Sequence, residues 1–130
     1  MKQINVAVIG VGSMGKNHAR VYSAIKDVKL AAVCDVNDES KKVTDEFNAK
    51  HYKNYKEMLN KEKLDAVSVC VPTKLHKQIA LDVIENKINV LIEKPIAATI
   101  EDAGGIIKSS EKNRVKLMVG HIEQFNPVVA

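Results

Sequence analysis

The N-terminal segment contains a glycine-rich run that could bind a phosphate group, namely Gly10-Val11-Gly12-Ser13-Met14-Gly15. It follows the apolar run 4–9, and Asp35 ends the next apolar run. A glycine-rich turn between a strand and a helix lets main-chain N–H groups approach a pyrophosphate, whose charge the helix N-terminus stabilises. An acidic residue about 20 positions further on accepts hydrogen bonds from ribose hydroxyls. The spacing therefore predicts one dinucleotide-binding site, made by this turn, Asp35 and the adjoining Val36.

The carboxylate of Asp35 also indicates which dinucleotide would bind. A carboxylate accepts hydrogen bonds from two ribose hydroxyls but repels a 2′-phosphate, so NAD is expected in preference to NADP. Lys41 and Lys42 would weaken this preference if they turned back towards the ribose. Their position in the next predicted helix favours solvent-exposed side chains instead.

Short apolar runs that alternate with helical patterns must position this site. Runs rich in Val, Ile and Ala predict strands that are buried on both faces. They span residues 4–9, 30–34, 66–71, 90–92 and 115–119. A short third strand is expected around His51 and Tyr52, between helical stretches near 38–48 and 55–60.

The clearest helical pattern spans residues 73–86, with Thr73 as the expected N-cap. Its apolar stripe consists of Leu75, Ile79 and Val83, supported by Ala80 and Ile84. This segment would follow the fourth strand and return the chain to the sheet.

A further helix is expected from Thr99, because Thr99 followed by Asp102 resembles a capping box. Apolar residues then recur at helical spacing, at Ile100, Ala103, Ile106 and Ile107. Gly104-Gly105 interrupts this pattern, and each mid-helix glycine costs up to about 1 kcal/mol relative to alanine. The pair therefore implies either close backbone packing or a local break.

The alternation of strands and helices predicts an α/β fold with a doubly wound parallel sheet, a Rossmann fold, because parallel strands are joined by right-handed crossovers. The simplest strand order is 3-2-1-4-5-6. In such a sheet the ligand crevice lies at the carboxyl ends of the strands.

Composition excludes several classes of protein. The 130 residues are 45% hydrophobic and 28% charged, which is ordinary for one globular domain. No apolar stretch approaches the roughly 20 residues that cross a bilayer, and no signal peptide is recognisable, so a cytoplasmic protein without membrane insertion is expected.

The net charge of +4 is scattered among acidic residues, which argues against nucleic acid as a partner. Cys34 and Cys70 lack metal-ligand spacing and are expected to be buried thiols, with no metal site.

Three further segments follow predicted strands on the crevice side. They are Val71-Pro72-Thr73-Lys74-Leu75-His76, Glu93-Lys94-Pro95 and Gly120-His121-Ile122-Glu123-Gln124-Phe125-Asn126-Pro127. Together with the glycine turn, they resemble the glucose-fructose oxidoreductase, inositol dehydrogenase and MocA (Gfo/Idh/MocA) family over essentially the whole chain. The Glu-Lys-Pro triplet is much more specific than the glycine motif. The last segment looks most like the branch that acts on nucleotide-linked sugars, such as UDP-N-acetylglucosamine 3-dehydrogenases.

The resemblance implies hydride transfer between NAD and a hydroxyl-bearing carbon of a sugar, cyclitol or nucleotide-linked sugar. Lys94 would be the catalytic lysine and would also contact substrate and cofactor, because a cation beside a developing alkoxide stabilises its charge. Glu93 would orient that lysine or contact the nicotinamide ribose. Pro95 would fix the turn, with a bond that could be cis. The competing interpretation of Lys94 is an exposed lysine at a strand end.

Residues on both sides of the triplet also acquire expected roles from the resemblance. Val71, Pro72 and Thr73 would lie along the cofactor. His76 would either reach the cofactor from one turn into the helix or lie on the helix surface. His121 and Asn126 would lie on the substrate side, with capping of a helix or strand as the alternative.

The resemblance also bears on Gln124 and His18. Gln124 stands where many relatives have arginine, which puts a phosphate- or carboxylate-binding role there in doubt. His18 matches a histidine common in the family's first helix, where packing is expected rather than reaction. His51 has no assigned role.

Members of the family are more than twice this long, and their second domain supplies much of the substrate pocket and the oligomer interface. Residues 1–120 are therefore expected to form the dinucleotide-binding domain, and 121–130 to begin the crossover to an absent substrate and oligomerisation domain. A piece cut from a longer chain, a truncated gene product and one chain of a split enzyme all fit. Apolar surface left uncovered would favour a homo-oligomer or a partner chain that carries the second domain.

The leading expectation is the NAD-binding half of an oxidoreductase, whose isolated chain binds the cofactor but is weakly active or inactive. The alternative is a stand-alone nucleotide-sensing regulatory module. Such a module needs the glycine turn and the acidic residue but not Glu93-Lys94-Pro95, so the triplet separates the two hypotheses.

Overall fold

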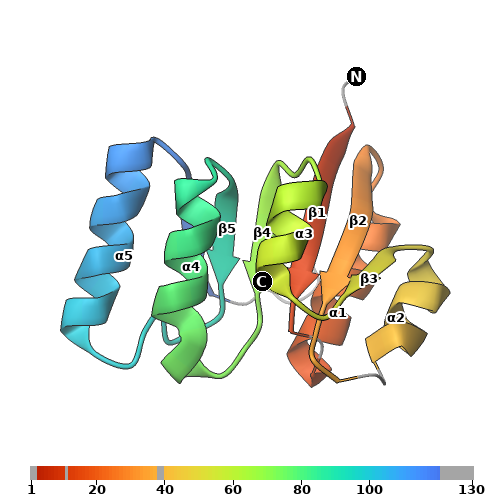
Figure 1. Ribbon diagram of the computed structural model, residues 1–130, viewed down its shortest axis with the longest axis horizontal. Coiled ribbons are helices and arrows are strands. Elements are labelled where there is room, and N and C mark those ends of the chain that lie inside the picture. Colours follow the sequence, from red (N-terminus) through yellow and green to blue (C-terminus); the bar gives the residue numbers. More distant parts are fainter. Residues whose placement is uncertain (1–2, 11, 38–39, 121–130) are drawn as a thin grey trace, which may run out of the picture.

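The computed structural model describes residues 3–10, 12–37 and 40–120, so the expectations for Val11, His121, Gln124 and Asn126 lie outside the described residues. Parallel strands form one sheet in the order β3-β2-β1-β4-β5-β6, which confirms the predicted doubly wound topology (Figure 1). The strands are β1 (Ile4–Ile9), β2 (Val28–Cys34), β3 (Lys50–Tyr52), β4 (Ala66–Val69), β5 (Asn89–Ile92) and β6 (Leu117–Val119). The helices are α1 (Ser13–Ala24), α2 (Ser40–Phe47), α3 (Tyr55–Lys61), α4 (His76–Glu85) and α5 (Ile100–Asn113), with the 3-10 turn η1 (Thr73–Leu75) before α4.

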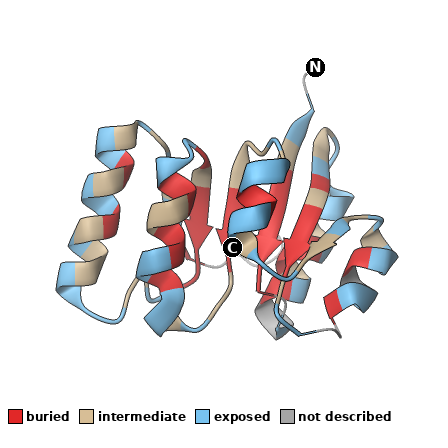
Figure 2. Ribbon diagram, in the orientation of Figure 1, coloured by how far each residue is buried: buried red, intermediate tan, exposed pale blue. Residues whose placement is uncertain are grey.

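The core lies on both faces of the sheet, because side chains of a strand alternate between its two faces. On β1, Val6 and Val8 pack with Ala19 of α1, whereas Ala7 and Ile9 belong to the larger cluster that includes residues of α3, α4 and α5. Figure 2 shows the buried residues concentrated on the central strands and on the inner sides of the helices. Full burial of each valine, leucine or isoleucine side chain contributes about 1.5–3 kcal/mol to the stability of the fold. The apolar runs therefore determine where the helices pack on the sheet.

The connection after β4 differs from the prediction. β4 ends at Val69 because its partner β1 ends at Ile9, where the chain turns away. The Leu75 N–H then donates to the Pro72 carbonyl at 2.9 Å, which closes η1. α4 starts at His76 without a side-chain cap, so the predicted Thr73 N-cap is wrong. Leu75 is 40% exposed, so its predicted place in the core stripe is also wrong.

α5 begins as predicted, since the Thr99 hydroxyl oxygen accepts a hydrogen bond from the Asp102 N–H at 3.0 Å. The helix continues through Gly104-Gly105, so a local break is wrong. Close packing does not explain the pair either. A Cβ at Gly104 would meet nothing within 4 Å in the described part of the chain, and at Gly105 only Lys77 Cε at 3.8 Å.

Replacing Gly104 by alanine is therefore expected to stabilise the domain by about 0.5–1 kcal/mol, because alanine loses less backbone entropy in a helix. Urea unfolding of the wild type and of Gly104→Ala measures the gain. An unchanged or lower free energy of unfolding would mean that the exposed glycine serves a purpose other than helix formation.

Within the described ranges, no helix has the length and apolarity that a bilayer span requires.

Candidate dinucleotide-binding site

The register of the sheet brings the predicted site residues to one edge. Ile9 pairs with Cys34 on one side and with Val69 on the other, so Asp35, Gly10 and Cys70 leave adjacent strands at the same level. Gly10 N–H donates to the Cys34 carbonyl at 2.7 Å, which ties the turn to β2. The strand order reverses between β1 and β4, and ligands of open α/β sheets bind at such a point.

The three glycines of the turn differ in the space that a side chain would find at each position. Gly10 has φ +90°, and a Cβ there would lie 2.7 Å from the Cys70 carbonyl oxygen. A Cβ at Gly15 would lie 1.9 Å from the Gly10 carbonyl oxygen. A Cβ at Gly12 would meet nothing within 4 Å among the described residues. Gly10 and Gly15 therefore allow the turn to pack on itself, while Gly12 borders open space that a ligand could enter.

The N-terminus of α1 lies beside that open space. Ser13 and Met14 begin the helix, and its N-cap Gly12 makes no side-chain capping bond. The first turn contains no acidic residue, so no carboxylate of that turn opposes the positive end of the helix dipole. Lys16 in the same turn adds a positive charge. These features fit a pyrophosphate, because backbone N–H groups and a helix N-terminus favour an anion.

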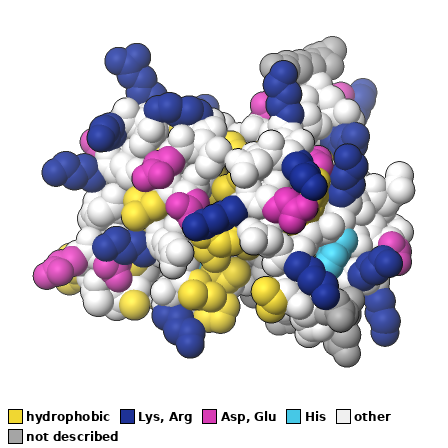
Figure 3. All heavy atoms as spheres, viewed as in Figure 1, with side chains coloured by type: hydrophobic (Ala, Val, Ile, Leu, Met, Phe, Trp, Pro, Cys, Tyr) yellow, Lys and Arg dark blue, Asp and Glu magenta, His cyan; other side chains and the backbone are white. Residues whose placement is uncertain are grey.

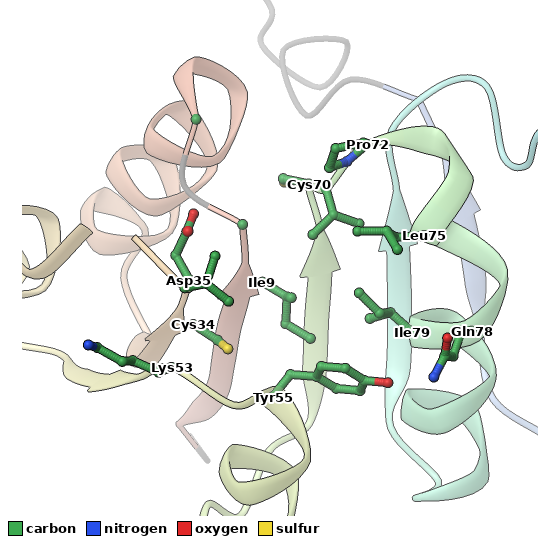
Figure 4. Close-up of a pocket in the computed structure, with 14 residues that line it drawn as sticks. Ile9, Cys34, Asp35, Lys53, Tyr55, Cys70, Pro72, Leu75, Gln78 and Ile79 are labelled. Carbon is green, nitrogen blue, oxygen red and sulfur yellow. The ribbon is translucent and has the colours of Figure 1, made fainter. Parts of the chain in front are cut away.

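A cavity of about 440 Å³ opens next to the turn. Its lining includes Gly10, Gly12, Asp35, Val36, Val71 and Pro72 of the predicted cofactor residues. Figure 3 shows apolar side chains gathered in a hollow on this face of the molecule. In the close-up, the Ile9 side chain lies between Asp35 on one side and Ile79 on the other, with the Tyr55 ring below them (Figure 4). Small-molecule pockets have this size and this largely apolar lining.

Asp35 follows β2 and is half-buried at the rim of the cavity. Its Oδ1 accepts a hydrogen bond from the Asn37 N–H at 2.9 Å, which fixes the carboxylate on its own turn. The described cavity lining includes Lys53 but neither Lys41 nor Lys42, both of which are exposed on α2. The expected exposure of Lys41 and Lys42 is thus confirmed, and the lysine that shares the cavity lining with Asp35 is Lys53, which the sequence analysis did not consider.

The sequence interpretation also missed Tyr55 as a wall of the cavity. Its hydroxyl donates to the carboxylate of Asp82 in α4, which fixes the ring across the opening between α3 and α4. Burial, followed by the bond to Asp82, raises the pKa of the Tyr55 phenol. A usable signal was available for both residues, because Lys53 and Tyr55 come directly after the third strand, at the same edge of the sheet.

Glu93 and Lys94 follow β5 at this edge, outside the lining of the cavity. Glu93 is buried, and its Oε1 lies 2.5 Å from Nε2 of His18. Lys94 is exposed, and its bond to Pro95 is cis, the isomer that the sequence left open. Burial, together with the charge of Glu93, raises the pKa of the Cys70 thiol to about 12.

His76 is 1% exposed, so the helix-surface alternative is wrong. Its Nε2 lies 2.8 Å from the Val71 carbonyl oxygen, and its Nδ1 lies 3.0 Å from that of Pro95. The ring therefore connects the loop after β4 with the loop after β5. Thr73, in the turn between them, is half-buried.

Both cysteines are free thiols, and Cys34 is buried as predicted whereas Cys70 is half-buried. The described part of the chain brings together no three His, Cys, Asp or Glu side chains that could hold a metal ion.

The strand order, the glycine turn and the cavity at the reversal point define a Rossmann dinucleotide-binding domain. Residues 4–121 match the family described as an oxidoreductase family with an NAD-binding Rossmann fold. The chain belongs to this Gfo/Idh/MocA oxidoreductase family.

Individual relatives agree with that membership. The chain is 32% identical to the UDP-N-acetylglucosamine 3-dehydrogenase of Acidithiobacillus ferrooxidans over 99% of its own length and 40% of that protein. It is 29% identical to an uncharacterised oxidoreductase of Bacillus subtilis over 97% of its length and 38% of that protein. The chain thus spans about two fifths of these relatives.

A solved structure that is similar to this chain contains a nicotinamide cofactor. It is the WlbA dehydrogenase from Bordetella pertussis in complex with NADH and UDP-GlcNAcA, with 27% identity and a TM-score of 0.86. The match covers 91% of this chain and 37% of that one.

Proposed function

We propose that this chain binds NAD or NADH across the carboxyl edge between β1 and β4. The adenosine lies in the 440 Å³ cavity, and the pyrophosphate lies over the N-terminus of α1. The observation that carries the proposal is the position of Asp35 at the rim of that cavity, beside Gly10 and Gly12. A carboxylate there accepts hydrogen bonds from the ribose hydroxyls, as it does in dinucleotide-binding folds.

The same site belongs, in the proposal, to an oxidoreductase that acts on a hydroxyl carbon of a sugar, cyclitol or nucleotide-linked sugar. The bound nicotinamide supplies the hydride acceptor or donor. Lys94, exposed at the end of β5, hydrogen-bonds the reacting hydroxyl and stabilises negative charge on its oxygen. Val71 and Pro72, which line the cavity, and Thr73, in the turn that follows, are assigned to contacts with the cofactor between the two regions. The similarity to a UDP-N-acetylglucosamine 3-dehydrogenase and to the WlbA complex with UDP-GlcNAcA supports this substrate class.

Substrate contacts beyond Lys94 are assigned to His121 and Asn126, with much of the pocket supplied by a further domain in the same protein or in a partner chain. The relatives are more than twice as long as the matched part, which supports such a domain. On this proposal the isolated chain binds the cofactor and turns over poorly.

Asp35 also selects NAD over NADP in this proposal, and Asp35→Ser tests it. The substitution removes a charged acceptor of two ribose hydroxyls, so NADH should bind about tenfold more weakly or worse. NADPH should bind more tightly than to the wild type, because repulsion of its phosphate disappears and Lys53 remains at the rim. Fluorescence titrations of the purified chain with NADH and NADPH measure both changes.

Asp45→Ser is the matched control, because it makes the same change in charge at a residue that is exposed on α2. It should leave both affinities within about twofold of the wild type, since screening weakens exposed charges at a distance. Wild-type protein that is folded but binds neither dinucleotide would overturn the proposed function. Equal affinities in wild type and Asp35→Ser would overturn the role of Asp35.

A further inference from the structure

A line of hydrogen-bonded polar side chains runs through the interior from α1 to the end of β5. Tyr22 and Ser68 lie 2.5 Å apart at their oxygens, and Ser68 Oγ lies 3.0 Å from Nδ1 of His18. Nε2 of His18 lies 2.5 Å from Oε1 of Glu93. His18 and Ser68 are fully buried, and Glu93 is 7% exposed. The line thus joins the helix layer on one face of the sheet to the crevice edge.

With an ionised Glu93, the donors and acceptors in this line fit one direction, which runs from Tyr22 to Glu93. Burial raises the pKa of the Tyr22 phenol, so its hydroxyl keeps its proton and can donate to Ser68 Oγ. The Ser68 hydroxyl can then donate to Nδ1 of a neutral His18, whose Nε2–H donates to Glu93. Each of the three contacts along the line then has one donor and one acceptor. A proton on Nδ1 alone would turn the Nε2 lone pair towards the carboxylate oxygen, which is repulsive for an ionised Glu93.

Glu93 needs such a donor because a buried carboxylate is costly unless it is hydrogen-bonded. Its position matters for the site, since Lys94 is the next residue. The far side of the same loop is held from the opposite face, where the His76 ring contacts the carbonyl oxygens of Pro95 at 3.0 Å and Ile96 at 3.2 Å. The Glu93-to-Ile96 loop is therefore fixed by one buried histidine at each end.

We propose that His18 is a positioning residue, which fixes the Glu93 carboxylate from inside the fold and thereby holds Lys94 and the nicotinamide side of the crevice in place. This proposal rests on the proposed function, because it assumes that the end of β5 faces the nicotinamide. His18 itself does not touch the ligand. Its effect is confined to the β5 side of the site, since the adenosine cavity is lined by other residues.

The first test needs no ligand. Long-range nitrogen–proton NMR of the imidazole rings in the wild type, with His18 assigned through His18→Gln, reports which ring nitrogen carries a proton. We expect a protonated Nε2 on His18, both in the wild type and in Ser68→Ala, which removes only the Nδ1 partner. A His18 ring that is protonated at Nδ1 and bare at Nε2 would overturn the proposal, because Glu93 would then be the donor.

The second test separates the two ends of the cofactor. Calorimetry compares NADH with ADP-ribose, which lacks the nicotinamide, in wild type, His18→Leu and His18→Gln. In His18→Leu, NADH should bind about tenfold more weakly, while the affinity for ADP-ribose stays within about twofold. His18→Gln should recover most of the NADH affinity, because its amide N–H can donate to Glu93. His18→Asn, polar but too short to reach, replaces the leucine variant if that variant does not fold.

The outcomes distinguish the two proposals. Equal loss of NADH and ADP-ribose in a folded His18 variant, or no loss of either, would overturn the positioning role while leaving cofactor binding intact in the wild type. Wild-type protein that binds neither ligand would overturn the proposed function, and with it the role of His18 towards the nicotinamide.

Discussion

Replacing Gly15 by alanine is expected to lower the free energy of unfolding by about 3 kcal/mol or more, because the new atom has no space. The added Cβ would lie 1.9 Å from the Gly10 carbonyl oxygen and 2.8 Å from its carbon. Both are backbone atoms, and Gly10 is tied to β2 by its hydrogen bond to Cys34. No side-chain rotation relieves this clash, so α1 must move away from the end of β1. Urea unfolding followed by circular dichroism measures the loss.

The matched control is Gly104→Ala, the same substitution at a helical glycine without a clash. The two variants should shift the midpoint of unfolding in opposite directions. A domain typically has only about 5–15 kcal/mol of stability, so Gly15→Ala should also reduce the yield of folded protein. Equal stability of wild type and Gly15→Ala would contradict the close approach of α1 to the glycine turn.

The strand order and the layers were predictable because they depend on patterns that the sequence carries locally. An apolar run followed by turn residues identifies a buried strand, and right-handed crossovers leave few ways to order such strands. The predicted strand at 4–9 coincides with β1, and the short strand around His51 is present as β3. Pairing of Ile9 with Cys34 and Val69 then brings Gly10 and Asp35 together without any further information.

The errors arose where an apolar or capping residue has more than one possible environment. Leu75 has the spacing of a core residue, but it lies on the cavity wall, and periodicity does not distinguish a wall that faces a ligand from one that faces the core. Thr73 has the chemistry of an N-cap, but the preceding Pro72 carbonyl closes a 3-10 turn instead. The local pattern thus predicted a helix correctly but placed its first residue too early in the chain.

The contacts of the two buried histidines could not be predicted, because their partners are distant in the chain. His18 contacts Glu93, 75 residues later, and His76 contacts the Pro95 carbonyl, 19 residues later. These contacts depend on the pairing of β4 with β5 and on how α1 and α4 pack on the sheet, which no local pattern carries. The resemblance to the family indicated that His18 packs, but not that it packs against the Glu-Lys-Pro triplet.

The second large effect is expected from Gly12→Ala, which should weaken NADH binding by about tenfold or more while leaving the domain folded. Gly12 has φ −67°, which alanine adopts without strain, and its added Cβ would meet no described atom within 4 Å. Alanine is a poorer N-cap than glycine, so a loss of up to about 1 kcal/mol in stability is expected. Fluorescence titration with NADH and urea unfolding of the same samples measure both quantities.

The substitution should affect binding more than stability, because the space beside Gly12 is the space that the proposed pyrophosphate occupies. A Cβ there holds the phosphates away from the N-terminus of α1, and each charge-assisted hydrogen bond that is lost costs about 1.5–3 kcal/mol. Gly15→Ala and Gly12→Ala therefore separate two uses of glycine in one turn, close packing within the protein and close approach of a ligand. Retained NADH affinity in a folded Gly12→Ala variant would place the pyrophosphate elsewhere, and Asp35 would then lose its role as the ribose acceptor, because the two positions are linked by the length of one nucleotide.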